Sequence, residues 1–170
     1  MNLLVRPAAA PDLPAVGAVH HRSRSAAYAG LVSAAALAAG SPAAMAHWWA
    51  ERWHYERDTH RLAVADRDGV VVGFSYAGPS PSVEAVELYA VHVDPSWQGT
   101  GAGRALMAGA LADLRAVGGG AANRAVLWVL TGNARARRFY ERGGWAADGA
   151  TRRAPIGSAR VPQVRYARSL

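Results

Sequence analysis

The sequence predicts a single domain of the mixed α/β (α+β) class. The chain has 170 residues, a length at which one core buries about 70% of the surface that the unfolded chain exposes. Strand-like and helix-like hydrophobic patterns alternate along the chain, and no internal repeat or interdomain linker divides it. We therefore expect residues 1–170 to form one domain.

The first part of the chain is expected to supply one short strand and two helices. Residues 2–6 have strand character, and a helix capped by Asp12 should then run to about Tyr28. In the second helix Trp49 and Trp53 are four positions apart, so they share one face. We expect this face to pack against the sheet.

The remainder of the chain is expected to hold six strands and two helices. The Asp68-Gly69 pair indicates a tight hairpin turn. Continuous apolar runs indicate buried strands, and residues 86–93 look buried on both faces. The expected strands are residues 61–65, 70–77, 86–93, 124–130, 145–150 and 163–167, and the expected helices are residues 101–117 and 133–142.

The composition narrows the function classes. All 19 basic residues are arginine, and the net charge is +7. Arginine suits bidentate contact with phosphate or carboxylate, which would fit an anionic partner such as a nucleotide cofactor. The abundance of Ala, Arg, Gly, Pro and Val equally fits GC-rich coding sequence, and we favour that explanation. The arginines are scattered without interleaved aromatic residues, so we expect no nucleic-acid partner.

Several site types are not expected. The chain has no Cys, which excludes disulfides, a thiolate nucleophile and sulfur-ligated metal. The spacing of His47, His54 and His60 matches no metal motif, so no metal is predicted. No leader pattern or long apolar run occurs, and the alanine-rich residues 26–46 are interrupted by polar residues, Gly and Pro. We expect a cytoplasmic protein with no membrane partner.

A glycine-rich segment joins the predicted strand 86–93 to the helix that follows. Residues 98–103 read Gln-Gly-Thr-Gly-Ala-Gly. Glycines let the main chain approach phosphate oxygens, and free N–H groups at a helix start attract anions. A P-loop would require Lys, and a dinucleotide fingerprint would require Gly at 104 or 106, where the chain has Arg104 and Leu106. The segment therefore predicts an anion site of another kind.

This segment resembles the Q/R-x-x-G-x-G/A signature of the GNAT acyltransferase superfamily. The surrounding string ELYAVHVDPSWQGTGAGRALM resembles that family's fourth strand and third helix, and VLTGNARARRFYERGGW resembles its second conserved block. YAGLV at residues 28–32 is similar to a frequent first-helix ending. The resemblance implies a central mixed, mostly antiparallel sheet of about seven strands, splayed between strands four and five and flanked by about four helices.

The resemblance also implies acetyl-CoA as co-substrate. Backbone groups of Val91 and Val93 would pair with pantetheine, and His92 between them should face away. Asn133 would hold the pantetheine arm, although an ordinary helix N-cap explains it nearly as well. Backbone N–H groups of the glycine-rich segment would bind the pyrophosphate, namely those of Gln98, Gly99, Thr100, Gly101, Gly103 and Arg104.

Transfer to an amine requires removal of a proton. An amine with a pKa near 10.4 is unprotonated in about one molecule in 10³ at pH 7, which opposes the reaction by roughly 4 to 5 kcal/mol. Similar enzymes often carry a carboxylate base where this chain has Glu87, and burial on an apolar strand would raise its pKa toward a useful range. An ion pair with an arginine is the alternative for Glu87. Glu84 and a water relay remain alternative bases.

Two tyrosines complete the candidate site. Tyr140 corresponds to the family's usual proton donor to the departing sulfur. Reference pKa values make full transfer unfavourable by about 2 kcal/mol, so a hydrogen bond to the thiolate is expected; a packed core tyrosine is the alternative. Tyr28 lies where the first helix would cover the acceptor cleft, and we expect it to contact the substrate.

The leading hypothesis is an N-acetyltransferase acting on a primary amine of a small molecule, by direct attack in a ternary complex. Protein or peptide N-terminal acetylation is an enzymatic alternative, and a non-catalytic acyl-CoA-binding regulatory module is the alternative from another class. Dimers are frequent among similar proteins, and the aromatic second helix would supply a face for one. The sequence indicates neither the acceptor nor the acyl-chain length.

Overall fold

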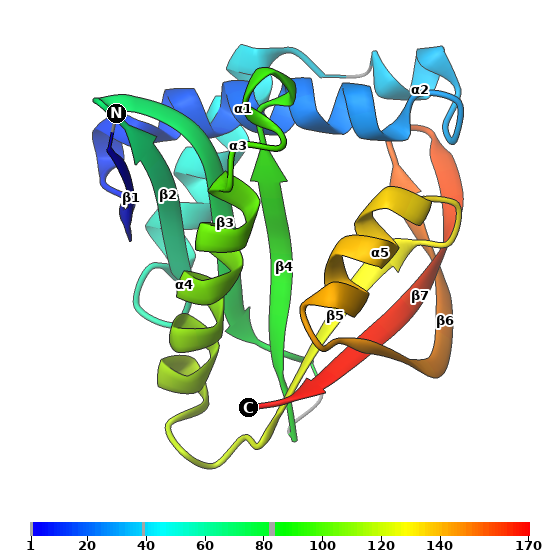
Figure 1. The fold of residues 1–170 in the computed structure, drawn as a ribbon. Coiled ribbons are helices and arrows are strands. Elements are labelled where there is room, and N and C mark those ends of the chain that lie inside the picture. Colours follow the sequence, from blue (N-terminus) through cyan, green and yellow to red (C-terminus); the bar gives the residue numbers. More distant parts are fainter. Residues whose placement is uncertain (1, 39, 82–83) are drawn as a thin grey trace.

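A seven-stranded sheet forms the centre of the computed structural model, which describes residues 2–38, 40–81 and 84–170 (Figure 1). The strands are β1 (Leu3–Pro7), β2 (Arg61–Arg67), β3 (Val70–Pro79), β4 (Val86–Val93), β5 (Arg124–Leu130), β6 (Ala146–Ile156) and β7 (Ala159–Ser169). Their order is β1-β2-β3-β4-β5-β7-β6, and only β4 and β5 run parallel. The predicted mixed, mostly antiparallel sheet is confirmed.

Helices cover both faces of this sheet (Figure 1). They are α1 (Leu13–Tyr28), α2 (Ala34–Leu37), α3 (Pro42–Glu56), α4 (Ala102–Gly118) and α5 (Ala134–Arg142), with short 3₁₀ turns η1 (Ala10–Asp12) and η2 (Pro95–Trp97). The α1 and α3 helices pack on one face of β2, β3 and β4, where Trp49 is 2% exposed and Trp53 lies beside the same cluster. The predicted packing of the two tryptophans is thereby confirmed. The α4 and α5 helices lie on the opposite face.

The two halves of the sheet separate between β4 and β5. These strands pair only at Val86 with Ala125 and at Glu87 with Val126. The β5 strand instead pairs with β7 along its whole length. Beyond Glu87, the edge of β4 that faces β5 has no strand partner among the described residues. The splayed sheet is therefore as predicted.

Local turn chemistry explains the β2–β3 hairpin. Asp68 and Gly69 have φ values of 51° and 87°, a left-handed conformation that Asp-Gly pairs tolerate in tight hairpin turns. The Gly69 N–H also donates to Asp66 Oδ1 at 2.8 Å. The predicted turn is confirmed.

Asp12 precedes α1 as expected, but its side chain does not cap that helix. It accepts from Arg6 Nη1 and from the Ala9 N–H, each at 2.8 Å. The carboxylate is therefore used in an ion pair with β1 and in the preceding 3₁₀ turn. The prediction of a side-chain cap was wrong because the Asp12 carboxylate is taken by Arg6 of β1 and by the Ala9 N–H.

Two strand predictions also need correction. Val86 to Leu88 are buried, but the remaining residues of β4 are only half-buried because β5 diverges from them. The final hairpin is longer than expected, since β6 and β7 extend to a turn near Gly157. A register shift between Ala147 and Thr151 interrupts the alternation of side chains along β6. The sequence pattern therefore did not indicate the full length of this strand.

None of the helices within the described ranges combines the length and apolar character that crossing a bilayer requires.

Candidate active site

The glycine-rich loop has an open surface. Gly99 and Gly101 have φ values of 81° and 94°, and a Cβ atom added at either would meet no atom within 4 Å. The loop is held from beneath, because Thr100 Oγ1 donates to the Trp97 carbonyl at 2.7 Å. The glycines are thus required by the backbone conformation, while the space above them stays open.

The start of α4 presents free main-chain donors to this space. Gly101 is the N-cap and has no side chain to accept from the first turn, and the first intrahelical bond is from Ala105 N–H to the Gly101 carbonyl. The N–H groups of Ala102, Gly103 and Arg104 consequently have no acceptor within the helix. A depression of about 560 Å³ lies here, lined by Gly99, Thr100, Gly101, Arg104, Ala105 and Ala108. The helix dipole adds positive potential, so the depression suits an anion.

Gln98 lies differently from the other predicted loop residues. Its backbone N–H donates to the Pro95 carbonyl at 3.4 Å, and its side-chain amide donates to the Val93 carbonyl at 3.4 Å. Gln98 therefore fastens the loop to the end of β4. Gly103 lies just inside the helix, where an added Cβ would come within 3.6 Å of Phe139 on α5.

Val91 and Val93 lie on the unpaired part of β4. The Asp94 N–H donates to the Val72 carbonyl of β3 at 2.9 Å. Because main-chain groups alternate in direction along a strand, the N–H groups of Val91 and Val93 point away from β3, toward the splay. The His92 side chain lies on the other face, stacked on Phe74 with ring centroids 5.2 Å apart. His92 thus lies on the face of β4 opposite the Val91 and Val93 side chains, which pack toward α4.

Asn133 caps α5. Its Oδ1 accepts from the Ala136 N–H at 3.1 Å. Asn133 therefore acts as an ordinary helix N-cap. It lies between the end of β5 and the start of α5.

Tyr140 and Tyr28 approach each other from different helices. Tyr140 on α5 packs against Phe139 and Trp145, with ring centroids 5.4 and 6.5 Å away. Burial raises the pKa of Tyr140 well above its ordinary value, and Tyr28 at the end of α1 raises it further. Burial also raises the pKa of Tyr28. Both hydroxyls are therefore protonated near neutral pH and can donate hydrogen bonds.

Glu87 is buried on β4, with 5% of its surface exposed. Burial raises the pKa of this carboxyl, as predicted, while Arg152 opposes the increase and Ser80 donates to Oε2 at 3.3 Å. Within the part of the chain that the structure describes, Glu87 forms no ion pair within 4.0 Å. Glu84, the alternative base, is exposed in the turn before β4.

A histidine pair on the α1 side was not anticipated from the sequence. Trp49 Nε1 donates to His20 Nδ1 at 3.0 Å, and His92 Nδ1 lies 2.7 Å from Ser23 Oγ. Burial lowers the pKa of His20 to about 2 and that of His92 to about 4, so both imidazoles are neutral at pH 7. No three His, Asp or Glu side chains among residues 2–38, 40–81 and 84–170 gather as metal ligands.

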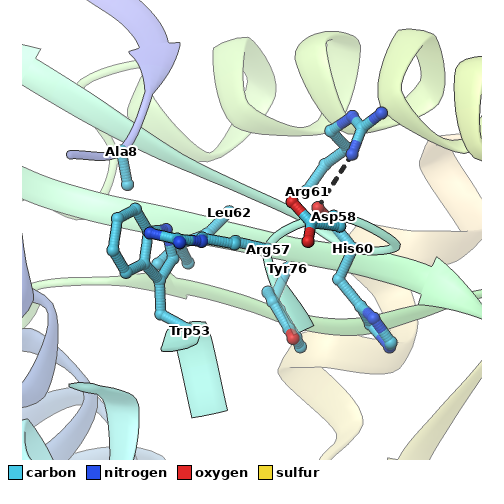
Figure 2. A pocket seen from close by; sticks show the side chains of 8 residues that line it. All are labelled: Ala8, Trp53, Arg57, Asp58, His60, Arg61, Leu62 and Tyr76. Carbon is cyan, nitrogen blue, oxygen red and sulfur yellow. Dashed lines mark hydrogen bonds between the residues drawn. The ribbon is translucent and has the colours of Figure 1, made fainter. Parts of the chain in front are cut away.

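A second pocket of about 270 Å³ lies between α3 and β2 and contains none of the predicted site residues (Figure 2). In Figure 2 the Arg57 side chain extends alongside the Trp53 ring, and the guanidinium carbon lies 5.2 Å from the ring centroid. Arg61 donates to the His60 carbonyl at 3.0 Å. Both contacts are local, the first at the end of α3 and the second between adjacent residues at the start of β2. The pocket is lined by Ala8, Trp53, Arg57, Asp58, His60, Arg61, Leu62 and Tyr76.

Comparison with known proteins identifies the family. The model of the acetyltransferase (GNAT) family matches residues 29–145, and the chain belongs to that family. Mycothiol acetyltransferase of Thermobispora bispora is 38% identical over 93 residues, which cover 50% of this chain and 30% of that protein. The corresponding protein of Beutenbergia cavernae is 41% identical over 80 residues, which cover 47% of this chain and 26% of the relative. The chain thus matches less than a third of the length of these relatives.

Solved structures show the same fold. PaiA N-acetyltransferase from Thermoplasma acidophilum, in complex with coenzyme A, superposes with a TM-score of 0.80 at 15% identity over 100% of both chains. Ribosomal-protein-alanine N-acetyltransferase from Brucella melitensis gives a TM-score of 0.72 at 25% identity, over 98% of this chain and 99% of the other. The fold predicted from the sequence motifs is thereby confirmed.

Proposed function

We propose that the chain is an acetyl-CoA-dependent N-acetyltransferase that acetylates a primary amine of a small molecule by direct attack in a ternary complex. The observation that carries the proposal is the arrangement of β4. Its carboxyl end leads into an open loop of main-chain donors, its middle faces the splay, and its beginning carries the buried Glu87.

The residues present fit acetyl-CoA. A pyrophosphate suits the depression at the start of α4, with donors from Gly99, Thr100, Gly101, Gly103 and Arg104. Gln98 would act mainly by holding this loop against β4. The free edge at Val91 and Val93 offers a pantetheine chain the hydrogen bonds that β5 does not make, and Asn133 lies at the α5 end of the same opening.

Acetyl-CoA supplies the acetyl group as a thioester, whose C–S bond breaks as the amine nitrogen forms the new C–N bond. The ionised Glu87 carboxylate accepts the proton that the ammonium must lose, directly or through water. A raised pKa makes Glu87 a better base near neutral pH. Tyr140 donates a hydrogen bond to the departing sulfur. Its own raised pKa makes complete proton transfer to a thiolate unfavourable, so the second proton that the nitrogen releases as the amide forms reaches the thiolate through solvent.

A non-catalytic acyl-CoA-binding module is less well supported, because such a module would need neither a buried carboxylate nor a tyrosine beside the splay. The choice between small molecule and peptide rests on weaker support. Two partial relatives are named for mycothiol, a small molecule, whereas one structural neighbour is named for a ribosomal-protein alanine. We favour the small molecule and keep N-terminal acetylation as the second candidate.

The decisive experiment measures thiol release from acetyl-CoA with panels of small amines and N-terminal peptides, beside calorimetric binding of acetyl-CoA. Release above hydrolysis with small amines supports the proposal, and release only with peptides supports the alternative. Binding without any release would favour the module. Sedimentation would test the homodimer expected through α3.

A further inference from the structure

The side chains around Glu87 belong to four different strands but share one face. Glu87 pairs with Val126 of β5, and Trp128, two positions further along β5, pairs with Arg165 of β7. Directly paired residues lie on the same face, as do residues two apart on a strand. The neighbours of Trp128 on β5 pack toward α5. Glu87, Trp128 and Arg165 therefore lie on the face opposite α5.

Arg152 of β6 joins the same face. It pairs with Gln163, which lies two positions from Arg165 on β7. The Arg152 guanidinium carbon lies 4.2 Å from the Trp128 ring centroid, and Arg152 Nε donates to Gln163 Oε1 at 2.7 Å. The ring and the amide hold the guanidinium in place without neutralising its charge.

The other arginines of this region already bind carboxylates. Arg165 Nε donates to Asp148 at 2.8 Å, and Arg52 Nε donates to Glu56 at 2.7 Å. Arg152 forms no ion pair within 4.0 Å in the described part of the chain. Its guanidinium is also the charged group that most strongly opposes the raised pKa of Glu87. The two opposite charges thus lie on the same face of the sheet and influence each other without forming an ion pair.

We propose that the acceptor is an amine that also carries a carboxylate, bound with its amino group at Glu87 and its carboxylate at Arg152. This inference rests on the proposed N-acetyltransferase function and names the substrate class for the same site. A planar guanidinium matches a carboxylate with two parallel hydrogen bonds. An amine with no other charged group would leave Arg152 without an anionic partner. A diamine would bring a second cation beside Arg152. The arrangement thus discriminates among amines by charge.

The test uses matched acceptors that differ only in the carboxylate. Thiol release from acetyl-CoA is measured with glycine and glycinamide, with β-alanine and its amide, and with ethylenediamine. Wild type and Arg152→Gln are compared for each pair, because the comparison between enzymes cancels the different basicity of the two amines. We expect Arg152→Gln to raise KM for the amino acids at least tenfold and to change KM for the amides less than threefold. Arg152→Lys keeps the positive charge but not the planar guanidinium, so it should raise KM for the amino acids less than Arg152→Gln does.

Arg153→Gln is the matched control. Arg153 is the next residue on β6, so its side chain points to the other face, and it donates to the Arg160 carbonyl. The substitution removes the same charge, and the acceptor preference should stay that of wild type. Thermal unfolding of each variant checks that it is folded.

The outcomes separate this inference from the proposed function. No change in KM for the amino acids in Arg152→Gln, or an equal loss for amino acids and amides, would overturn the carboxylate site while leaving the acetyltransferase intact. A loss of preference in Arg153→Gln equal to that in Arg152→Gln would also overturn it. Absence of thiol release with every amine would overturn both.

Discussion

The two ends of β4 differ in how they would bind a ligand. At the carboxyl end, the proposed cofactor region offers main-chain N–H groups from one continuous segment, residues 99–104. At the amino end, the proposed acceptor region offers side chains from several strands, with Glu87 on β4 and Arg152 on β6. The first region therefore depends on backbone conformation, and the second on tertiary packing. Substitutions should accordingly separate cofactor binding from turnover.

The largest effect is expected for Glu87→Gln. Removing a general base costs about 10² to 10⁴-fold in rate, so kcat should fall by that range in the thiol-release assay. Acetyl-CoA affinity, measured by calorimetry, should stay unchanged because the loop is at the other end of the strand. The acid limb of the wild-type pH profile should lie above the ordinary carboxyl value of 4.5, since the base works only when ionised and burial raises its pKa.

Glu84→Gln is the control for this prediction, because Glu84 is exposed near the start of the same strand. It should retain the activity and pH profile of wild type. A large loss in Glu84→Gln with full activity in Glu87→Gln would assign the base to Glu84 instead.

Gly101→Ala should weaken acetyl-CoA binding, which Glu87→Gln should leave unchanged. A side chain at φ 94° is strained, at a cost of about 1 to 2 kcal/mol, and relief of that strain would turn the first N–H groups of α4. We expect acetyl-CoA to bind about 5 to 30-fold more weakly by calorimetry. Gly149→Ala is a matched control, because Gly149 has φ 90° with equally open space but lies on β6. If Gly149→Ala weakened acetyl-CoA binding as much, the effect would be one of general stability.

Tyr140→Phe should have a smaller effect. The phenyl ring keeps the packing against Phe139 and Trp145 but removes the proposed hydrogen bond to the departing sulfur. We expect kcat to fall about tenfold, the value of a hydrogen bond of about 1.4 kcal/mol, with acetyl-CoA affinity retained. Tyr55→Phe, at an 82% exposed position, should leave kcat unchanged. Undiminished kcat in Tyr140→Phe would reduce Tyr140 to a packing residue.

The last prediction concerns stability rather than activity, at His92 on the face of β4 that packs against α1. His92 has a pKa of about 4 in the folded protein, below the ordinary 6.5, so its stabilisation is complete above pH 6.5 and is lost as the pH falls toward 4. Between pH 7 and pH 5 this amounts to at most about 2 kcal/mol of unfolding free energy. Urea unfolding at both pH values measures it. His92→Gln should show a smaller decrease, whereas His54→Gln, at an exposed position, should behave like wild type.

Much of the proposed cofactor region was predictable because its signals are local. The glycines at 99 and 101 specify backbone conformations that side chains disfavour, and Asn133 caps the helix that directly follows it. The Asp68-Gly69 hairpin was predictable for the same reason. Burial of Glu87 also followed from its apolar strand. The side chain of Asp12 was misjudged because its partner Arg6 lies outside its own turn.

The sequence alone determined the order of the strands and of the long helices, and the glycine loop, because propensity, turn geometry and apolar runs act between near neighbours. Its resemblance to the GNAT family pointed to Glu87 as the candidate base. Only the tertiary structure decided that β5 leaves β4 after Glu87, that Gln98 binds the Val93 carbonyl and that Arg152 reaches the Glu87 face. These features depend on strand register and on contacts between distant residues. The local sequence does not distinguish Arg152 from the other arginines of the 19 in the chain. Only the folded structure places Arg152 on the same face as Glu87.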